Sequence, residues 1–250
     1  MRIAAVSDIH SNVYALQAVL DDIRQRGADY RVNLGDILYG PIAPKATYDL
    51  LMQEQLITIR GNQDRQIYDA TPEEIADNPT MAFILQDLGE EPLQWMRELP
   101  FDHQLTDDVY LCHGTPTDDL IYLLEDVSSG KAHLRHEDEI IKLLDGQSSG
   151  LILCGHTHTP RSVYTSTGQL IVNPGSVGLP AYTDDEPVLH SMENFSHHAS
   201  YAMLEHNGHC WIVNHIKVPY DYEAAAKDAM ARGRGDWEHF LRTGRGLSTP

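Results

Sequence analysis

Short apolar runs alternate with amphipathic stretches along the first sixty residues. Residues 2–7 are mostly apolar, which predicts a short buried strand. Apolar side chains then recur at helical spacing from Val13 to Ile23, and Gly27 supplies a stop. The alternation continues with a strand at 30–34, a helix at 44–55 and a strand at 56–59. This strand–helix–strand rhythm predicts an α/β architecture with parallel strands.

Further elements follow in the rest of the chain. Residues 65–100 are polar and proline-punctuated, and we expect helices that form a lid over the strand ends. The other predicted elements are strands at 109–112 and 151–154, a helix at 134–145, hairpins at 161–172 and 201–218, and a helix at 221–232.

Two polar stretches break this pattern. Residues 183–199 predict a loop insertion, and residues 233–250 predict a tail in which Trp237 and Phe240 are anchors. Exposed aromatic side chains in that tail would hint at self-association, but the oligomeric state stays open. The whole chain, 1–250, is expected to be a single domain, at the upper end of the size of one core.

The composition narrows the classes of partner. The formal net charge is −19, which repels the phosphate backbone and argues against binding to duplex nucleic acid. No run of 18 apolar residues is present, so no membrane span is expected, and the N-terminus does not resemble a signal peptide. We therefore expect a cytoplasmic protein. Cys112, Cys154 and Cys210 are too few and too scattered for a disulfide framework. Cys112 and Cys154 each end an apolar run, which favours small buried hydrophobes.

Metal-capable side chains follow directly after the predicted strands. They lie in five glycine-containing or turn segments, Asp8-Ile9-His10, Gly35-Asp36, Gly61-Asn62-Gln63-Asp64, His113-Gly114 and Gly155-His156-Thr157-His158. Because the carboxyl ends of parallel strands meet at one edge of a sheet, these segments should converge. Asp-x-His and His-x-His spacing in extended backbone would point both side chains the same way.

The donor set predicts the kind of metal site. Two carboxylates and four imidazoles exceed what one ion needs, whereas two ions that share a bridging carboxylate, roughly 3.5–4 Å apart, would use them all. Carboxylate, imidazole and amide oxygen suit Mn²⁺, Fe or Zn²⁺. We expect two divalent ions, with Mn²⁺ favoured. Asp118 and Asp119 follow His113 closely, but they favour a turn over a further ligand. The histidines outside these segments, such as His197, are expected to be incidental.

In these segments the chain resembles the calcineurin-like metallophosphoesterase superfamily. The family pattern is D-x-H, G-D, G-N-H-D/E, a lone H and G-H-x-H, and residues 8–158 follow it. Residues 173–178 resemble the family's closing loop, and residues 35–41 resemble bacterial phosphodiesterase-type members related to diadenosine tetraphosphatase. The resemblance implies an α/β (α+β) fold, a four-layer αββα sandwich of two mixed β-sheets flanked by helices.

The resemblance also implies roles for single residues. It assigns one metal to Asp8, His10 and His158, the second to Asn62, His113 and His156, and the bridge between them to Asp36. We hypothesise further that the catalytic set is Asp36, Asn62, Gln63 and Asp64. Arg60 and Arg65 flank the Gly-Asn loop, so they either bind the substrate with Asn62 or are solvated surface arginines. Asp64 would either orient a ligand histidine or cap the following helix.

One position departs from the family pattern. Gln63 stands where relatives carry a histidine that protonates the leaving group, and a carboxamide cannot act as a general acid. We therefore hypothesise that a metal-activated hydroxide hydrolyses phosphodiesters or related esters with good leaving groups, on a small, nucleotide-like phosphorylated substrate. The alternatives are a phosphomonoesterase or protein phosphatase, and a non-catalytic scaffold that retains the fold.

Overall fold

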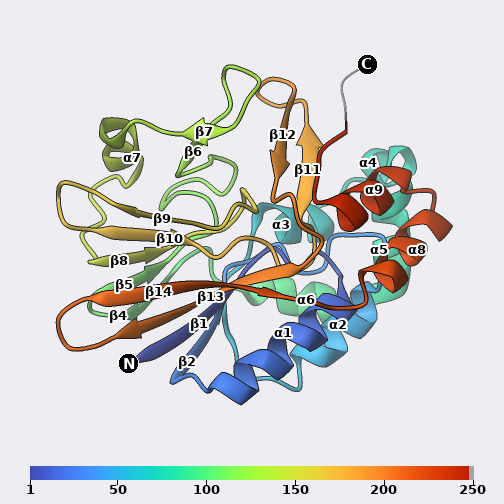
Figure 1. Cartoon of the computed structure of the whole chain (residues 1–250). Helices are drawn as coiled ribbons and strands as arrows, with labels where there is room; N and C mark the ends of the chain where they lie inside the picture. Colours follow the sequence, from blue (N-terminus) through green and yellow to red (C-terminus); the bar gives the residue numbers. More distant parts are fainter. Residues whose placement is uncertain (248–250) are drawn as a thin grey trace.

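The computed structural model describes residues 1–247 and contains two five-stranded mixed sheets (Figure 1). In the first sheet three parallel strands from the N-terminal half lie beside a C-terminal antiparallel pair. Its order is β14 (Trp211–Val218), β13 (Ala199–His206), β1 (Arg2–Val6), β2 (Tyr30–Asn33) and β3 (Ile57–Thr58). The chain thus closes this sheet with its last hairpin, which was predicted at 201–218 and turns at Asn207–Gly208, with φ of 96° at Gly208.

The second sheet has a parallel centre and an antiparallel strand at each edge. Its order is β4 (His103–Thr106), β5 (Val109–Leu111), β8 (Leu151–Leu153), β10 (Leu170–Asn173) and β9 (Arg161–Tyr164). The parallel strands run from the middle to one edge of the first sheet and form the centre of the second. Their carboxyl ends lie together in each sheet, where the predicted ligand segments begin.

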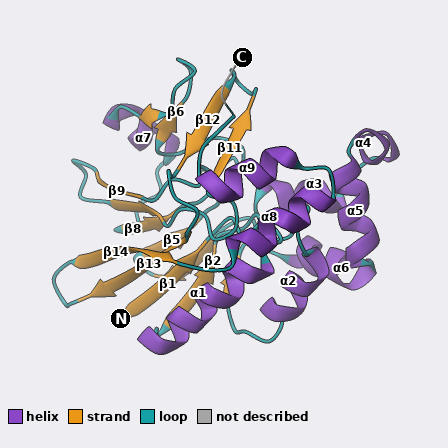
Figure 2. Cartoon of the chain, turned by 45° about the vertical axis from the view of Figure 1, so that its right-hand side comes forward, coloured by secondary structure: helices purple, strands orange, loops and turns teal. Residues whose placement is uncertain are grey.

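The alternation of side chains along each strand builds the layers. In β1, Ile3 and Ala5 lie in the core between the two sheets, while Ala4 and Val6 lie under helices. Those helices gather on one side of the first sheet (Figure 2). They are α1 (Val13–Arg26), α2 (Pro44–Leu51), α3 (Asn62–Tyr68), α4 (Pro72–Asp77), α5 (Pro79–Leu88), α6 (Glu90–Glu98) and α8 (Tyr222–Ala231).

The outer face of the second sheet is covered more thinly. Helix α7 (Glu137–Leu143) supplies Ile140, which packs with Cys112, Ile152 and Cys154. The two cysteines are fully buried, as expected of small hydrophobes, and burial raises the pKa of both thiols. Helix, sheet, sheet and helix form the four layers that the resemblance implied.

The expectation of a lid at 65–100 is half wrong. This segment is helical, as predicted, but α5 and α6 bury Met81, Ile84 and Met96 in the core beneath the first sheet. Apolar faces buried this way belong to the outer layer of the sandwich and do not cover the strand ends. No residue of 65–100 lines the cavity at the predicted ligands.

The loop expected at 183–199 is instead largely a hairpin. Strands β11 (Ala181–Asp184) and β12 (His190–Glu193) pair antiparallel, and His190 is buried. The expectation failed because one face of this polar hairpin packs on Tyr122 and Val127, contacts that no local pattern reveals. A smaller pair, β6 (Glu125–Asp126) with β7 (His133–Leu134), lies nearby.

The expected tail also contains an element. Helix α9 (Gly235–Thr243) buries Trp237, Phe240 and Leu241 against α8 and β11. The two anchors are therefore confirmed, whereas the expected exposure of tail aromatics is wrong. The last part of the predicted tail, 248–250, lies outside the described residues. Within residues 1–247, no helix combines the length and the apolar character that crossing a bilayer requires.

Candidate metal centre

The backbone at the predicted ligands adopts an uncommon conformation. Asp8, His10, Asp36, His156 and His158 all have φ between 48° and 70°, in the left-handed region that non-glycine residues rarely occupy. The expectation that Asp8 and His10 sit in extended backbone is therefore wrong. Their side chains still point to one place, because left-handed residues turn the chain sharply after each strand. A strained backbone conformation of this kind persists only where many surrounding contacts hold it, and such conformations are concentrated at functional sites.

Tight backbone contacts hold these turns. The Asp8 N–H donates to the Gly35 carbonyl at 2.9 Å, and the His10 N–H donates to the Asp36 carbonyl at 3.1 Å. A Cβ built on Gly61 would lie 2.1 Å from the Asp36 Oδ1 atom. Glycine at position 61 is therefore a condition for the Asp36 loop and the Gly61 loop to meet.

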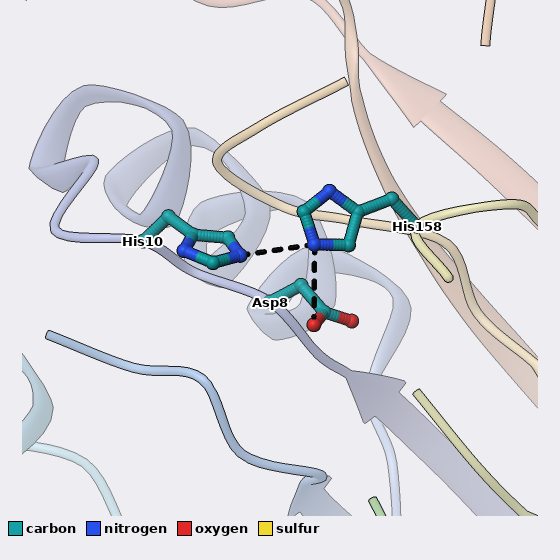
Figure 3. Close-up of side chains that lie close together, drawn as sticks. All are labelled: Asp8, His10 and His158. Atoms are coloured by element: carbon teal, nitrogen blue, oxygen red, sulfur yellow. Dashed lines mark hydrogen bonds and ion pairs between the residues drawn. The ribbon is translucent and has the colours of Figure 1, made fainter. Parts of the chain in front are cut away.

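The first group of ligands joins two distant loops (Figure 3). Asp8 and His10 follow β1, and His158 follows β8. The Nε2 atoms of His10 and His158 lie 2.9 Å apart, and His158 Nε2 lies 3.4 Å from Asp8 Oδ1. All three side chains are buried.

The second group has the same design. Asp36, His113 and His156 bring one donor atom each to within 4.8 Å of the others. His113 Nε2 lies 3.0 Å from Asn62 Oδ1 and 3.4 Å from Asp36 Oδ2. The structure thus brings together all seven ligands that the sequence predicted.

Hydrogen bonds to backbone carbonyls fix the tautomer of each imidazole. The Nδ1 atoms of His10, His113 and His158 lie 3.1, 2.7 and 2.7 Å from the carbonyl oxygens of Tyr39, Leu34 and Leu179, respectively. A carbonyl only accepts, so each Nδ1 donates and each Nε2 faces the centre. His156 is reversed, since its Nε2 donates to the Leu120 carbonyl at 3.1 Å.

Each carboxylate has one oxygen held and one oxygen facing the imidazoles. Asp8 Oδ2 accepts from the His156 N–H at 3.2 Å, and Asp36 Oδ1 accepts from the Gln63 N–H at 2.9 Å. The other oxygen of Asp8, Oδ1, is buried and has no hydrogen-bond partner. A buried anionic oxygen that faces nitrogen lone pairs requires a cation. The donor set therefore fits divalent metal ions.

Electrostatics couple the two groups through Asp36. Burial lowers the pKa of His10 and of His156 to about 4, with neighbouring imidazoles adding to the effect, so both rings are neutral at pH 7. Burial also works against protonated His113, but the Asp36 carboxylate outweighs it and raises that pKa to about 10. Asp36 acts on imidazoles of both groups.

The closing loop predicted at 173–178 locks the two ligand loops together. The Ser176 hydroxyl donates to the Asp8 carbonyl at 2.7 Å. The Asn173 amide donates to the Gly155 carbonyl at 2.7 Å and to the Thr157 hydroxyl at 3.0 Å. The loop after β10 thus fixes the distance between the Asp8 and His158 segments.

Arg60 and Arg65 do not reach the centre. Arg60 Nη1 lies 2.9 Å from Asp119 Oδ2, and Arg65 Nη2 lies 2.7 Å from Asp119 Oδ1. The expectation that these arginines bind substrate is not supported, because one buried carboxylate binds both and neither lines the cavity at the ligands. Asp118 forms the expected turn, since its carboxylate accepts from the Leu120 N–H at 2.8 Å. Asp119 instead clamps the loop after His113 to the Gly61 loop.

Asp64 caps a helix and supports a loop. Its carboxylate accepts from the N–H groups of Gly61, Asp36 and Ile37, each at 2.9 Å. Of the two roles expected for it, the structure supports the helix cap and shows no bond to a ligand histidine. Burial, with the charge of Asp36, raises the Asp64 pKa to about 7.

A cavity of about 290 Å³ opens at the ligands, and sequence reasoning missed part of its wall. Tyr122 and Tyr182 line it, with ring centroids 4.7 Å from His156 and 4.6 Å from His158, and their hydroxyls are hydrogen-bonded at 2.7 Å. Arg234 also lines it, bound to Asp236. These residues come from loops and late elements without local motifs, and only the anchor role of Trp237 gave a signal.

Fold and centre together define the class of protein: an αββα sandwich that carries two adjacent groups of carboxylate and imidazole ligands at its strand ends. Residues 1–195 match the calcineurin-like phosphoesterase superfamily domain, and the chain belongs to this superfamily. It is therefore a hydrolase that acts on phosphate esters, in a family that uses divalent metal ions.

Individual relatives agree with this placement. An uncharacterized protein of Methanocaldococcus jannaschii, MJ0912, is 25% identical over 94% of both chains. The phosphodiesterase YfcE of Escherichia coli is 26% identical over 72% of this chain and 81% of its own, which supports the phosphodiesterase-type branch expected from residues 35–41. The crystal structure of a metallophosphoesterase from Sphaerobacter thermophilus shares the fold, with a TM-score of 0.74, 22% identity and coverage of 98% of this chain and 100% of that one.

Proposed function

We propose that this chain is a phosphodiesterase that works with two divalent metal ions. The observation that carries the proposal is the convergence of imidazole nitrogens on the inward-facing oxygens of Asp8 and Asp36. In the proposed assignment Asp8, His10 and His158 hold one ion. Asn62, His113 and His156 hold the other, and Asp36, which acts on imidazoles of both groups, bridges them.

Mn²⁺ is the proposed native ion, with Fe and Zn²⁺ as the alternatives. The donors are carboxylate, imidazole and carboxamide oxygen, without thiolate, and these suit all three metals. Bound divalent cations would supply Lewis acidity that offsets charge on the phosphoryl oxygens and acidifies the attacking water.

The side chain at position 63 bears on which phosphate esters the centre would cleave. The Gln63 side chain lines the cavity, and its buried Oε1 has no hydrogen-bond partner. A carboxamide does not supply a proton to the leaving oxygen, so esters with good leaving groups are favoured. Aryl phosphodiesters and nucleotide-like diesters meet this condition better than alkyl monoesters. We expect a small phosphorylated substrate and a cytoplasmic location.

The proposal is tested by a hydrolysis screen on the Mn²⁺-loaded protein. The panel contains bis(4-nitrophenyl) phosphate, 4-nitrophenyl phosphate, a phosphopeptide and a dinucleoside polyphosphate, with Asp36→Asn as the control. We expect the aryl diester to react fastest and the control to lose nearly all activity. Faster reaction of the phosphopeptide or the monoester would point to a phosphatase. Mn²⁺ binding without hydrolysis of any ester would point to a scaffold, and undiminished activity of Asp36→Asn would overturn the two-metal assignment.

A further inference from the structure

A second and larger cavity adjoins the metal centre. Its volume is about 570 Å³, and it shares Asn62, Gln63, Tyr122 and His156 with the cavity at the ligands. A substrate whose phosphorus lies at the centre therefore has room for one substituent on this side. The shared residues include a proposed ligand from each of two loops, so the two cavities are parts of one continuous surface.

Two exposed apolar side chains stand together in the wall of this second cavity. Leu120 and Ile121 line it and expose 54% and 37% of their area, and the exposed Pro187 lies in the same wall. Exposed apolar side chains grouped beside a polar reaction centre mark a binding surface. The Tyr122 ring, at 4.7 Å from the ring of His156, extends this surface to the ligands.

The loop that carries Leu120 is held in place. Arg60 and Arg65 bind Asp119, and the Leu120 carbonyl accepts from His156 Nε2 at 3.1 Å. The backbone that carries the Leu120 side chain is thereby fixed relative to a proposed metal ligand. A wall on a rigid backbone loses less entropy when it binds an organic group.

Charge in the second cavity is unfavourable to a second phosphate. The lining contains the carboxylates of Asp126, Asp184 and Glu186 against the single guanidinium of Arg135. That guanidinium already donates to the Tyr122 carbonyl at 3.0 Å and lies 3.7 Å from Glu139. A polyphosphate chain would thus meet net negative charge there, whereas an uncharged aromatic or aliphatic group would not.

We propose that the cavity walled by Leu120 and Ile121 is the subsite for one uncharged organic group of the diester. This subsite selects substrates with a neutral, apolar ester group over those with a second phosphate. The inference rests on the phosphodiesterase function proposed for the adjoining centre, which it makes more specific. In this assignment Leu120 and Ile121 determine specificity and take no part in the bond-breaking step.

The test is a calorimetric comparison of two non-hydrolysable anions on the Mn²⁺-loaded protein. Diphenylphosphinate and dimethylphosphinate present the same PO₂⁻ group and differ only in their organic groups. We expect diphenylphosphinate to bind at least about 10-fold more tightly, a ratio typical of a filled apolar pocket. In the double variant Leu120→Ser/Ile121→Ser that ratio should fall by roughly 10-fold, while the Kd of dimethylphosphinate stays the same.

Two controls sharpen the test. Ile212→Ser removes an equally exposed apolar side chain from β14, away from the centre, and should keep the wild-type ratio. Bis(4-carboxyphenyl)phosphinate should bind more weakly than diphenylphosphinate, and Glu186→Gln should narrow that difference by about 2-fold, a modest effect because the charge is solvent-exposed. Equal affinities of the two plain phosphinates, or a ratio unchanged in the double variant, would overturn the subsite alone. Failure of both phosphinates to bind would overturn the function proposed for the centre and the subsite with it.

Discussion

The Nε2 atoms of His10 and His158 face one another at 2.9 Å. Each ring donates through Nδ1 to a backbone carbonyl, so in the neutral form of both rings two lone pairs point at the same small volume. Two facing lone pairs repel each other, and a cation between them and Asp8 removes the repulsion. The same feature recurs across the centre, where hydrogen bonds to backbone carbonyls orient all four histidines proposed as ligands.

Metal binding should therefore stabilise the folded chain markedly. A ligand that binds only the folded state at about 100 times its Kd adds about 2.7 kcal/mol. For a chain of this size the gain corresponds to a rise in Tm of roughly 5–10 °C. Differential scanning calorimetry of the chelated and Mn²⁺-loaded protein measures the shift. Elemental analysis of the loaded protein should find about two ions per chain, and one ion or none would contradict the two-metal assignment.

Gly61→Ala should weaken metal binding by displacing Asp36. The added Cβ would lie 2.1 Å from Asp36 Oδ1 and 2.5 Å from the Asp36 backbone nitrogen, so the two loops must separate. We expect a stability loss of about 1–3 kcal/mol together with loss of the second bound ion. The matched control is Gly235→Ala, where the nearest atom to the added Cβ is Met230 Sδ at 3.9 Å. Full metal occupancy in Gly61→Ala would show that the close approach is not required.

Asp119→Asn should destabilise the protein in a pH-dependent way. Burial alone would raise the Asp119 pKa, but Arg65 and Arg60 outweigh it and hold the pKa below its usual value. The carboxylate therefore contributes stability above its unfolded pKa, near 4, and that contribution disappears as the pH falls through the lower folded pKa. We expect a loss of about 2 kcal/mol at pH 7.

Urea unfolding of wild type and Asp119→Asn at pH 7 and near pH 3 measures this difference. It should be large at pH 7 and should shrink in acid. Asp118→Asn is the matched control, since that carboxylate accepts a single backbone bond, from Leu120, and touches neither arginine. A difference between wild type and Asp119→Asn that stays constant down to pH 3 would mean that the ion pairs do not account for the stability.

Gln63→His should restore a proton donor beside the centre. General acid catalysis contributes about 10²–10⁴-fold where the leaving group is poor and little where it is good. The variant should therefore gain rate on alkyl diesters relative to aryl diesters by about 10-fold or more, as measured by kcat/KM on a leaving-group series. Gln66→His, one turn away on the same helix, is the control. Rate ratios equal to those of wild type would refute the assignment of position 63.

The local sequence pattern was sufficient to predict the parallel half of the fold and the positions of the candidate ligands. Strand periodicity and glycine turns mark the ends of β1, β2, β5 and β8, and the sheet rule then brings Asp8, Asp36, His113 and His156 together. These inferences succeed because each depends on a few adjacent residues and on one rule of parallel sheets.

The surroundings of the ligands were decided only by tertiary contacts. The sequence predicted a loop where the structure has the hairpin β11–β12, and a tail where it has the helix α9. Both predictions failed because the apolar residues of these elements pack against residues far away in the sequence. Their position beside the Gly-Asn loop predicted that Arg60 and Arg65 bind substrate. In the structure Asp119, more than fifty residues later in the chain, forms ion pairs with both.

The backbone conformation at the candidate ligands also depended on tertiary contacts and not on local sequence. Residue types and spacing named the seven ligands, but they implied extended backbone, whereas Asp8, His10 and His158 adopt left-handed φ values. Left-handed backbone is intrinsically unfavourable for these residues, so local sequence does not select it. The turn at Asp8 and His10 is held by hydrogen bonds to the carbonyls of Gly35 and Asp36 and by one from the Ser176 hydroxyl. These partners come together only when the whole sandwich has folded. The sequence by itself therefore determined which candidate ligands follow the strand ends, and the tertiary structure decided their orientation and the shape of the cavities around them.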